Sequence, residues 1–357
     1  MVKKLTCLFF VIVLVVGCSK DESQINIQSQ ISKLESGWLV PLDQLLISQL
    51  PADRIKSIDS PHFVPLIQGN INPNEKVYAY RYGNTVKIYP ERILGGHEIV
   101  NDYIDDHYYA ITYCPLTGSA VAWNRKINGE ISEFGVSGHL FNENLIPYDR
   151  NGNTYWSQML ISGIKGMNGG DELESGQLIS TNGESIKAAF PSALILVDTS
   201  GNICTDSICI PLKQGSNEGE PGDSEIDLPS GDYFGLVNIG VANGGEHALL
   251  FTYSNFNSST TIIKTSFGNS KIIVIGSNDM QFIIAFIYNS SIPEIDFIPS
   301  QNNLPVLFSD NKGNQYDMSG FIISGPDTGD RLISPVAYSA HSFAWESFFG
   351  NNIEVYK

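Results

Sequence analysis

Hydrophobic and polar residues alternate in short segments from about residue 76 onwards. The segments VYAYRY (77–82) and VKIYP (86–90) flank a Gly83-Asn84 turn and predict a β-hairpin. Further short strands, each ending near Gly, Asn, Asp or Pro, are predicted for YYAITYC (108–114), SAVAWNR (119–125), ISEFGVS (131–137) and NLIPYDR (144–150). The pattern suits strands joined by turns more than long helices. It predicts a β-rich α+β fold of mainly antiparallel strands with short helices.

The region before these strands has a different pattern. Residues 38–69 mix Pro, Asp and Ser with isolated apolar residues, which predicts irregular structure wrapped around a core. A helical turn or two is expected between Leu42 and Leu50.

Two stretches of the chain resemble each other. DRNGNTY (149–155) leads through MLISG to Gly163, and DNKGNQY (310–316) leads through FIISG to Gly325. Upstream of each stretch, the segment SAVAW matches the segment FIIAF. The shared pattern is a turn followed by a strand, which indicates an internal repeat.

The repeat predicts the domain organisation. We expect a first copy over residues 38–198 and a second, degenerate copy over 233–357, joined by an acidic Gly/Ser/Pro-rich linker over 199–232. The alternative is a coincidence between two β-rich stretches, because Gly-Asn turns are common in such proteins.

The N-terminus has the layout of a secretory signal peptide. Two lysines precede an apolar run over residues 5–16, which is shorter than the about 20 apolar residues that a membrane span needs. The run ends in Gly17 and Cys18, a site typical of bacterial lipoproteins, in which cleavage leaves an acylated cysteine. We therefore predict a signal peptide over 1–17, a lipid on Cys18 and a polar tether over 18–37.

A lipid on Cys18 predicts attachment to a membrane without a span. The expected location is the bacterial envelope, at the outer membrane, on either its periplasmic or its external face. The alternative is cleavage at another position, with Cys18 incidental.

Charge and cysteine content narrow the possible partners. The chain has 38 Asp and Glu against 21 Lys and Arg, a formal net charge of −17, so a nucleic acid partner is not expected. Of the five cysteines, Cys204 and Cys209 share a short polar segment and predict a local disulfide in an oxidising compartment. Cys114 is left as the odd thiol.

Polar residues interrupt the apolar pattern of the first copy, so we expect a functional site there. The segment after Pro90 contains His97, Glu98, Asn101 and Asp102. If this segment is helical, a spacing of four places His97 and Asn101 on one face, and Glu98 and Asp102 on the next. Such a cluster can orient an imidazole as a base or a metal ligand. The alternative is a hydrogen-bonded turn that supports the core.

Cys114 ends a predicted strand just before a proline. As a thiolate it would be a nucleophile, a redox group or a soft metal ligand, and a nearby His97 would lower its pKa. The alternative is a small buried hydrophobic residue.

Other polar residues of the first copy could contact a small ligand. These are Thr117, Ser137, Asp149, Arg150, Trp156 and Gln158. The segment FGVSG lacks the Gly-x-Ser-x-Gly spacing of a nucleophile elbow, so Ser137 is expected to form hydrogen bonds rather than to attack a substrate. For Asp149 and Trp156 the alternatives are a turn residue and a core residue.

Four of these segments carry a family resemblance. IYPERILGGHEIVND (88–102), TYCPLTGSAVAW (112–123), FGVSG (134–138) and YDRNGNTYWSQ (148–158) resemble the family known as domain of unknown function 3179. The motifs come in the family's order and at its approximate spacing, over about residues 38–198. Many members carry a second Cys at the position of Thr117, so a dithiol mechanism within this motif is excluded here. The resemblance implies no established reaction, substrate or cofactor.

The sequence thus predicts an envelope lipoprotein that acts as a small-ligand-binding or interaction module, with its site in the first copy. Whether the partner is a small molecule or a protein is left open. One alternative is a redox or transferase enzyme that uses Cys114 and a His97 base oriented by Glu98 or Asp102. Another is a copper or zinc site formed by Cys114 and His97.

Overall fold

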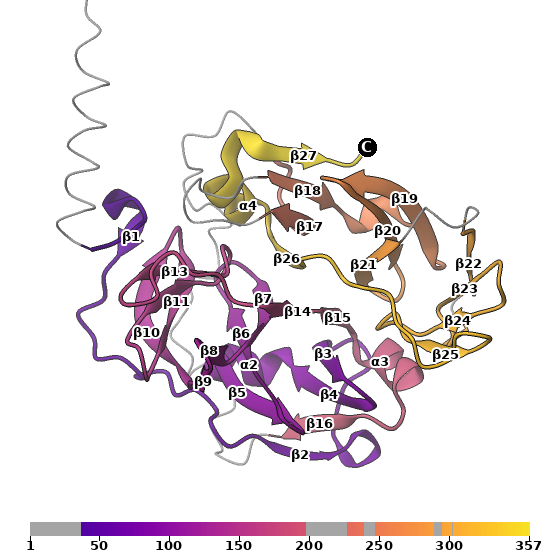
Figure 1. Ribbon diagram of the computed structural model, residues 1–357, viewed down its shortest axis with the longest axis horizontal. Helices are drawn as coiled ribbons and strands as arrows, with labels where there is room; N and C mark the ends of the chain where they lie inside the picture. The colour runs from indigo at the N-terminus through magenta and orange to yellow at the C-terminus, as the bar shows by residue number, and fades with distance from the viewer. Residues whose placement is uncertain (1–36, 198–226, 239–246, 289–294, 302) are drawn as a thin grey trace, which may run out of the picture.

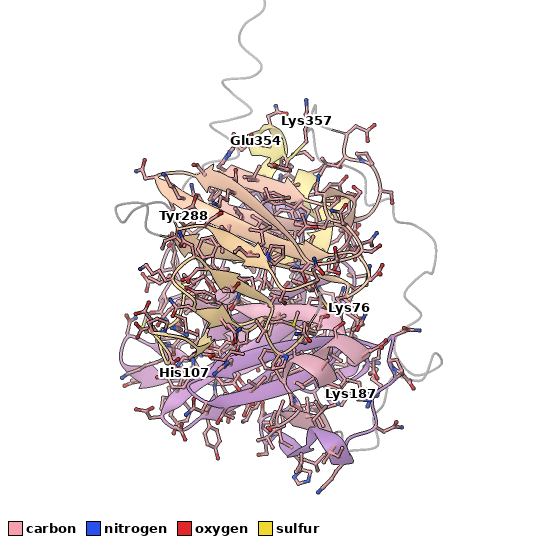
Figure 2. The ribbon with its side chains drawn as sticks, turned by 90° about the vertical axis from the view of Figure 1, so that its right-hand side faces the viewer. Lys76, His107, Lys187, Tyr288, Glu354 and Lys357 are labelled. Carbon is pink, nitrogen blue, oxygen red and sulfur yellow. The ribbon has the colours of Figure 1, made fainter. Side chains whose placement is uncertain are left out.

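The computed structural model describes residues 37–197, 227–238, 247–288, 295–301 and 303–357. Short antiparallel strands dominate these residues, and the few helices are short, so the predicted β-rich fold is confirmed. We call residues 37–197 the N-terminal half and residues 227–357 the C-terminal half; Figure 2 shows one half above the other. The predicted signal peptide, Cys18, Cys204 and Cys209 lie outside the described residues. Within the described ranges, no helix is both long and apolar enough to cross a membrane.

A five-stranded sheet forms the centre of the N-terminal half. Its order is β15-β3-β4-β16-β2, made of β2 (His62–Pro65), β3 (Lys76–Tyr82), β4 (Thr85–Pro90), β15 (Leu178–Asn182) and β16 (Leu194–Val197). The predicted hairpin is confirmed, because Tyr82 pairs with Thr85 across the turn between β3 and β4. Helix α3 (Gly183–Ala189) follows β15 and returns the chain so that β16 runs parallel to β4.

Two further layers complete this half (Figure 1). One is the sheet β14-β7-β6-β5, built from β5 (Ile99–Ile104), β6 (His107–Cys114), β7 (Ser119–Asn124) and β14 (Ser175–Gly176), with helix α2 (Glu91–His97) before it. The other is the sheet β1-β10-β11-β12-β13, built from β1 (Leu45–Leu46), β10 (Phe134–Phe141), β11 (Asn144–Asp149), β12 (Tyr155–Ser157) and β13 (Ser162–Lys165). Strands β8 (Lys126–Ile127) and β9 (Glu130–Ile131) form a small separate hairpin.

The C-terminal half has the same sequence of sheets. Its elements are β17 (Asp232–Asn238), β18 (His247–Phe251), β19 (Thr261–Phe267), β20 (Ser270–Ser277), β21 (Phe282–Tyr288), β22 (Phe297–Pro299), β23 (Phe308–Asp310), β24 (Gln315–Tyr316), β25 (Ile322–Ser324), β26 (Ala337–His341), α4 (Ser342–Phe349) and β27 (Ile353–Val355). The order β26-β17-β18-β27 matches β15-β3-β4-β16, and in both sheets the strand after the helix pairs in parallel. This correspondence supports the predicted internal repeat, which stays a prediction.

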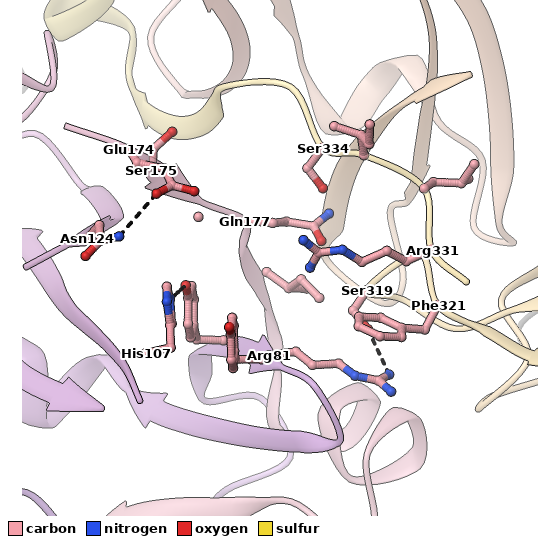
Figure 3. Close-up of a pocket in the computed structure, with 16 residues that line it drawn as sticks. Arg81, His107, Asn124, Glu174, Ser175, Gln177, Ser319, Phe321, Arg331 and Ser334 are labelled. Carbon is pink, nitrogen blue, oxygen red and sulfur yellow. Dashed lines mark hydrogen bonds between the residues drawn. The ribbon is translucent and has the colours of Figure 1, made fainter. Parts of the chain in front are cut away.

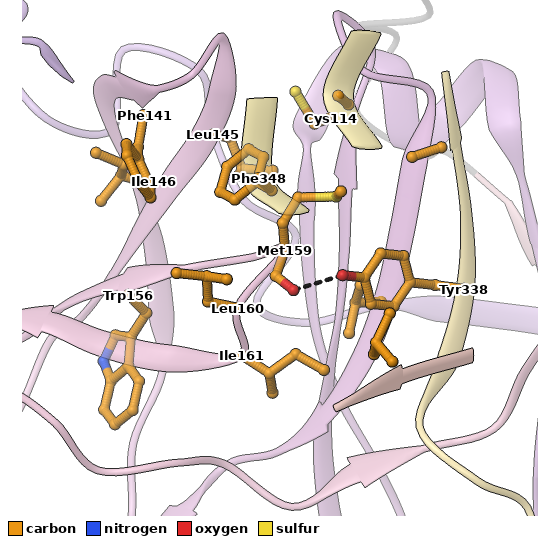
Figure 4. Close-up of a cluster of buried hydrophobic side chains, with 14 of the residues drawn as sticks. Cys114, Phe141, Leu145, Ile146, Trp156, Met159, Leu160, Ile161, Tyr338 and Phe348 are labelled. Carbon is orange, nitrogen blue, oxygen red and sulfur yellow. Dashed lines mark hydrogen bonds between the residues drawn. The ribbon is translucent and has the colours of Figure 1, made fainter. Parts of the chain in front are cut away.

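The core is shared between the two halves. One apolar cluster joins Trp156 and Met159 of the N-terminal half to Trp345 and Phe348 of the C-terminal half. The Tyr338 hydroxyl donates a hydrogen bond to the Met159 carbonyl across this boundary, at 2.5 Å (Figure 4). Because each fully buried side chain of this size contributes roughly 1.5–3 kcal/mol, each half depends on the other for much of its stability.

A second apolar cluster also contains residues of both halves. Val77 and Ala79 on β3 belong to the same apolar cluster as Phe282 and Phe286 on β21. The other face of β3 presents tyrosines to the β5–β7 layer. Alternation along β3 therefore reflects two different buried faces rather than one buried and one solvated face.

The N-terminal wrapping segment has a short helical turn near its start. A 3-10 helix, η1, covers only Leu42–Gln44, and β1 follows at once. Of the one or two helical turns expected between Leu42 and Leu50, the structure has one, because Leu45 and Leu46 pair with the edge of β10.

Candidate ligand-binding cleft

A cleft of about 310 Å³ lies between the two halves. Its residues come from the end of β3, the start of β6, the end of β7, the segment from β14 into β15, and two loops of the C-terminal half. They include Tyr80, Tyr82, His107, Glu174, Phe321 and Arg331 (Figure 3). The volume is at the low end of the range for small-molecule sites, so the cleft suits a ligand about as large as a single sugar ring.

Stacked aromatic rings form one side of the cleft. The Tyr82 and His107 rings lie parallel, with centroids 4.1 Å apart, and the Tyr80 ring continues the stack. Tyr80 and His107 share a hydrogen bond of 2.7 Å between the phenol oxygen and Nε2. Burial lowers the pKa of His107 and raises that of Tyr80, because it disfavours the charged form of each group.

Two arginines and a phenylalanine form the opposite wall. The Arg81 guanidinium lies 3.6 Å from the centre of the Phe321 ring and forms an ion pair with Asp317. The Arg331 guanidinium lies 5.7 Å from the same ring. It forms no hydrogen bond or ion pair with any residue that the structure describes, and Figure 3 shows it pointing into the cleft. The positive charge of Arg331 is therefore available to a ligand.

A carboxylate lies on the side of the cleft opposite Arg331. Asn124 donates a hydrogen bond of 3.1 Å to Glu174 Oε2, and both side chains line the cleft. The hydroxyls of Ser175, Ser319 and Ser334 and the Gln177 amide complete a polar lining. The cleft can therefore exchange many hydrogen bonds with a ligand and also offers it apolar ring surface.

Comparison with known proteins identifies the N-terminal half. Residues 52–204 match the model of the family described as "Protein of unknown function (DUF3179)". This part of the chain is a DUF3179 domain. No curated protein and no solved structure matches the chain. Phe321 and Arg331 lie outside the DUF3179 match and the aromatic stack lies within it, so the cleft joins the family domain to the rest of the chain.

The DUF3179 motif at residues 148–158 forms a closed turn. The Asp149 carboxylate accepts hydrogen bonds from the Gly152 and Thr154 amides and from Trp156 Nε1, at 3.0 Å for the indole. Asp149 and Trp156 are buried. Asp310 occupies the corresponding turn of the C-terminal half, where its carboxylate accepts a hydrogen bond of 2.8 Å from the Tyr316 hydroxyl. The structure thus engages Asp149 and Trp156 in holding a turn rather than in facing a cavity.

Arg150 holds the wrapping segment against the DUF3179 domain. Its guanidinium pairs with Asp59 at 2.8 Å, Glu133 at 2.9 Å and Asp53 at 3.3 Å. Three acidic groups around one arginine leave no free positive charge for an anionic ligand at this place.

The cluster expected after Pro90 does not lie on one helix. Helix α2 ends at His97, Glu98 adopts a left-handed conformation with φ of 59°, and Asn101 and Asp102 lie on β5. The expectation that residues four apart share one helix face is therefore wrong. The helix ends at His97, and along the strand that follows consecutive side chains point to opposite faces.

Each member of this group has its own structural contacts. The Asn101 amide bonds to the backbone of Phe134, and Asp102 pairs with Lys87 at 2.8 Å. His97 Nδ1 donates to the Lys56 carbonyl at 2.7 Å, while its Nε2 is buried without a partner among the described residues. Burial raises the pKa of Glu98 to about 7.

Cys114 is buried beside Phe348 and Met159 (Figure 4). Its thiol donates a weak hydrogen bond to the Glu143 carbonyl at 3.7 Å rather than pairing with His97. Burial raises the pKa of the thiol, and the nearby Glu98 carboxylate adds to the effect. A thiolate with an imidazole base is therefore not assembled, and no group of three potential metal ligands occurs in the parts of the chain that are described.

A buried polar network lies next to Cys114. Ser119 donates to Gln158 Oε1 at 2.6 Å, and Asn144 donates to the same oxygen at 2.8 Å and to Thr117 Oγ1 at 2.9 Å. The amide nitrogen of Gln158 reaches Thr112 Oγ1 at 3.0 Å. Sequence reasoning named Thr117 and Gln158 but missed the other three, and this closed network has no opening to a ligand. Ser137 likewise bonds within its sheet, to the Ile146 carbonyl.

Sequence reasoning also missed every residue of the cleft. The available signal was the density of tyrosines in VYAYRY and HYYAITY, which place polar-tipped rings at strand ends. Arg331 carried no such signal, because only the packing of the two halves brings it to the DUF3179 domain.

Proposed function

We propose that the protein is an envelope lipoprotein that binds a small hydroxylated acid, such as a hexuronate, in the cleft between its halves. The free guanidinium of Arg331 carries this proposal, because a guanidinium without an ion pair at a polar cleft suits a carboxylate, which it can bind with two hydrogen bonds.

The rest of the lining suits the body of a sugar ring. The faces of the Tyr80, Tyr82 and His107 rings offer flat surfaces for its C–H groups. The amides of Asn124 and Gln177 and the Glu174 carboxylate can exchange hydrogen bonds with its hydroxyls. Glu174 also disfavours a ligand with a second negative charge near that side of the cleft.

Substitution of Arg331 tests the proposal. Calorimetric titration with galacturonate should show binding to the intact mature chain and at least tenfold weaker binding to Arg331→Gln. A charge-assisted hydrogen bond contributes about 1.5–3 kcal/mol, and 1.4 kcal/mol is a factor of ten. Lys271→Gln is the matched control, since Lys271 is exposed on β20 and does not line the cleft. Equal affinities of the two variants would contradict the proposed role of Arg331.

The lipid on Cys18 belongs to the same proposal and has its own test. Cells fed radioactive palmitate should label the full-length chain, and Cys18→Ala should lose the label while the protein is still exported. A labelled Cys18→Ala variant would remove the lipoprotein assignment and leave the cleft proposal standing.

A further inference from the structure

Exposed apolar side chains gather in one short segment of the described chain. Leu39, Leu42, Leu46, Ile47 and Leu50 are 37–60% exposed, which makes them five of the thirteen exposed large hydrophobic residues among those described. We call these five residues the leucine patch. In Figure 1 its strand, β1, lies at the outer edge of the β10–β13 layer. Scattered exposed apolar residues are ordinary, but such a concentration marks an interaction surface.

The backbone of this segment is held firmly while these side chains point outward. Trp38 and Val40 are buried in the core on either side of Leu39, and Leu45 packs against the same core beside Leu46. The Ser48 amide donates to His139 Nδ1 at 3.0 Å. The leucine patch is therefore a fixed feature of the surface rather than a loose stretch that could turn inward.

A neighbouring loop extends the patch. The amide of Leu39 donates to the Ile164 carbonyl at 2.8 Å, which places Leu39 beside the turn after β13. Leu39 also lies against Gly169: a Cβ atom placed on this glycine would be 3.3 Å from Leu39 Cδ1. Met167, two residues earlier, is 86% exposed and adds a flexible apolar side chain.

We propose that the leucine patch rests on the lipid bilayer that holds the acylated Cys18; this rests on the lipid anchor in the proposed function. The described chain begins at Gly37, so residues 18–36 can keep it at most about 65 Å from the membrane. The leucine patch is the first apolar surface after that tether. Residues 38–50, which carry the patch, contain a single charged residue, Asp43. The acidic protein gains no attraction from anionic headgroups, so apolar contact must hold the patch on the bilayer.

Vesicle sedimentation without the lipid tests the contact in isolation. The mature chain, residues 18–357 with Cys18→Ser, should sediment with vesicles of zwitterionic phosphatidylcholine, which has no net charge, and 0.5 M salt should not release it. The double variant Leu46→Glu/Leu50→Glu should bind at least tenfold more weakly. The matched control Ile67→Glu/Ile298→Glu changes two exposed residues elsewhere and should bind like the parent chain.

Three outcomes would overturn this inference. They are no sedimentation of the parent chain, equal loss in the control variant, or a dimer by light scattering that Leu46→Glu/Leu50→Glu dissolves, which would make the patch a self-association surface. Thermal melting of each variant confirms that it is folded. Because this experiment omits the acyl chain, its failure together with successful palmitate labelling would remove the bilayer contact and leave the lipid anchor intact.

Discussion

At the scale of single residues, burial decides what the polar groups of the DUF3179 motifs can do. Cys114 was expected as either a nucleophile or a buried thiol, and the structure encloses it among apolar side chains. Its burial could not be read from the sequence, because the covering residue Phe348 comes from the far end of the chain. The Cys/His enzyme is therefore not the function that the geometry favours.

Glu98 gives a prediction about pH at this scale. Its folded pKa of about 7 exceeds the unfolded value of about 4.3. Between these pH values the carboxyl is protonated in the folded state and ionised in the unfolded state. This stabilisation is complete below about pH 4.3 and is lost as the pH rises through about 7, a difference on the order of 3–4 kcal/mol. Glu98→Gln should therefore raise the urea midpoint at pH 8 and leave it nearly unchanged at pH 4.5. Glu130→Gln, at an exposed position, is the control, and an equal effect of Glu98→Gln at both values would show that its carboxyl is not perturbed.

At the scale of elements, local patterns predicted strands well and side-chain geometry poorly. The turn at Gly83-Asn84 and the strands around it follow from alternation and turn chemistry, both of which are local. The group from His97 to Asp102 was misplaced because a helix ends inside it, at a left-handed Glu98 that no helix-ending glycine announces. Boundaries of this kind depend on tertiary packing of α2 against β6.

The Asp149 turn predicts a large effect from one side chain. Asp149→Ala leaves the Gly152 and Thr154 amides and the Trp156 indole N–H without their acceptor in a buried place. Unfolding in urea should show a loss of about 2–4 kcal/mol. Asp279→Ala, at an exposed site, should change stability by less than about 0.5 kcal/mol. A loss below 1 kcal/mol for Asp149→Ala would mean that the turn holds without its carboxylate.

At the scale of the whole molecule, the two halves bury each other's apolar faces. The internal similarity suggested two successive copies, but no local pattern could show that one half supplies the core of the other. The same arrangement creates the cleft, since Arg331 and the aromatic stack line it from the two sides of this boundary. The sequence therefore predicts a site in the first copy, at residues that hold turns and ion pairs in the structure, and gives no signal for the Arg331 side of the cleft.

The shared core predicts that the DUF3179 domain does not fold by itself. Residues 38–198 alone lose Trp345, Phe348 and Tyr338 from their main apolar cluster. The truncated chain should lack a cooperative thermal transition and should bind a hydrophobic dye, while residues 38–357 should melt cooperatively. A cooperative transition of the shorter chain at a similar temperature would show that the shared core is not needed for folding.

The central claim is that the cleft between the halves binds a small hydroxylated acid, and calorimetry with paired sugars tests it most directly. The mature chain should bind galacturonate at one site per chain and at least tenfold more tightly than galactose, which has the same ring without the carboxylate. Equal affinity for the two sugars, or no heat with either, would contradict the claim.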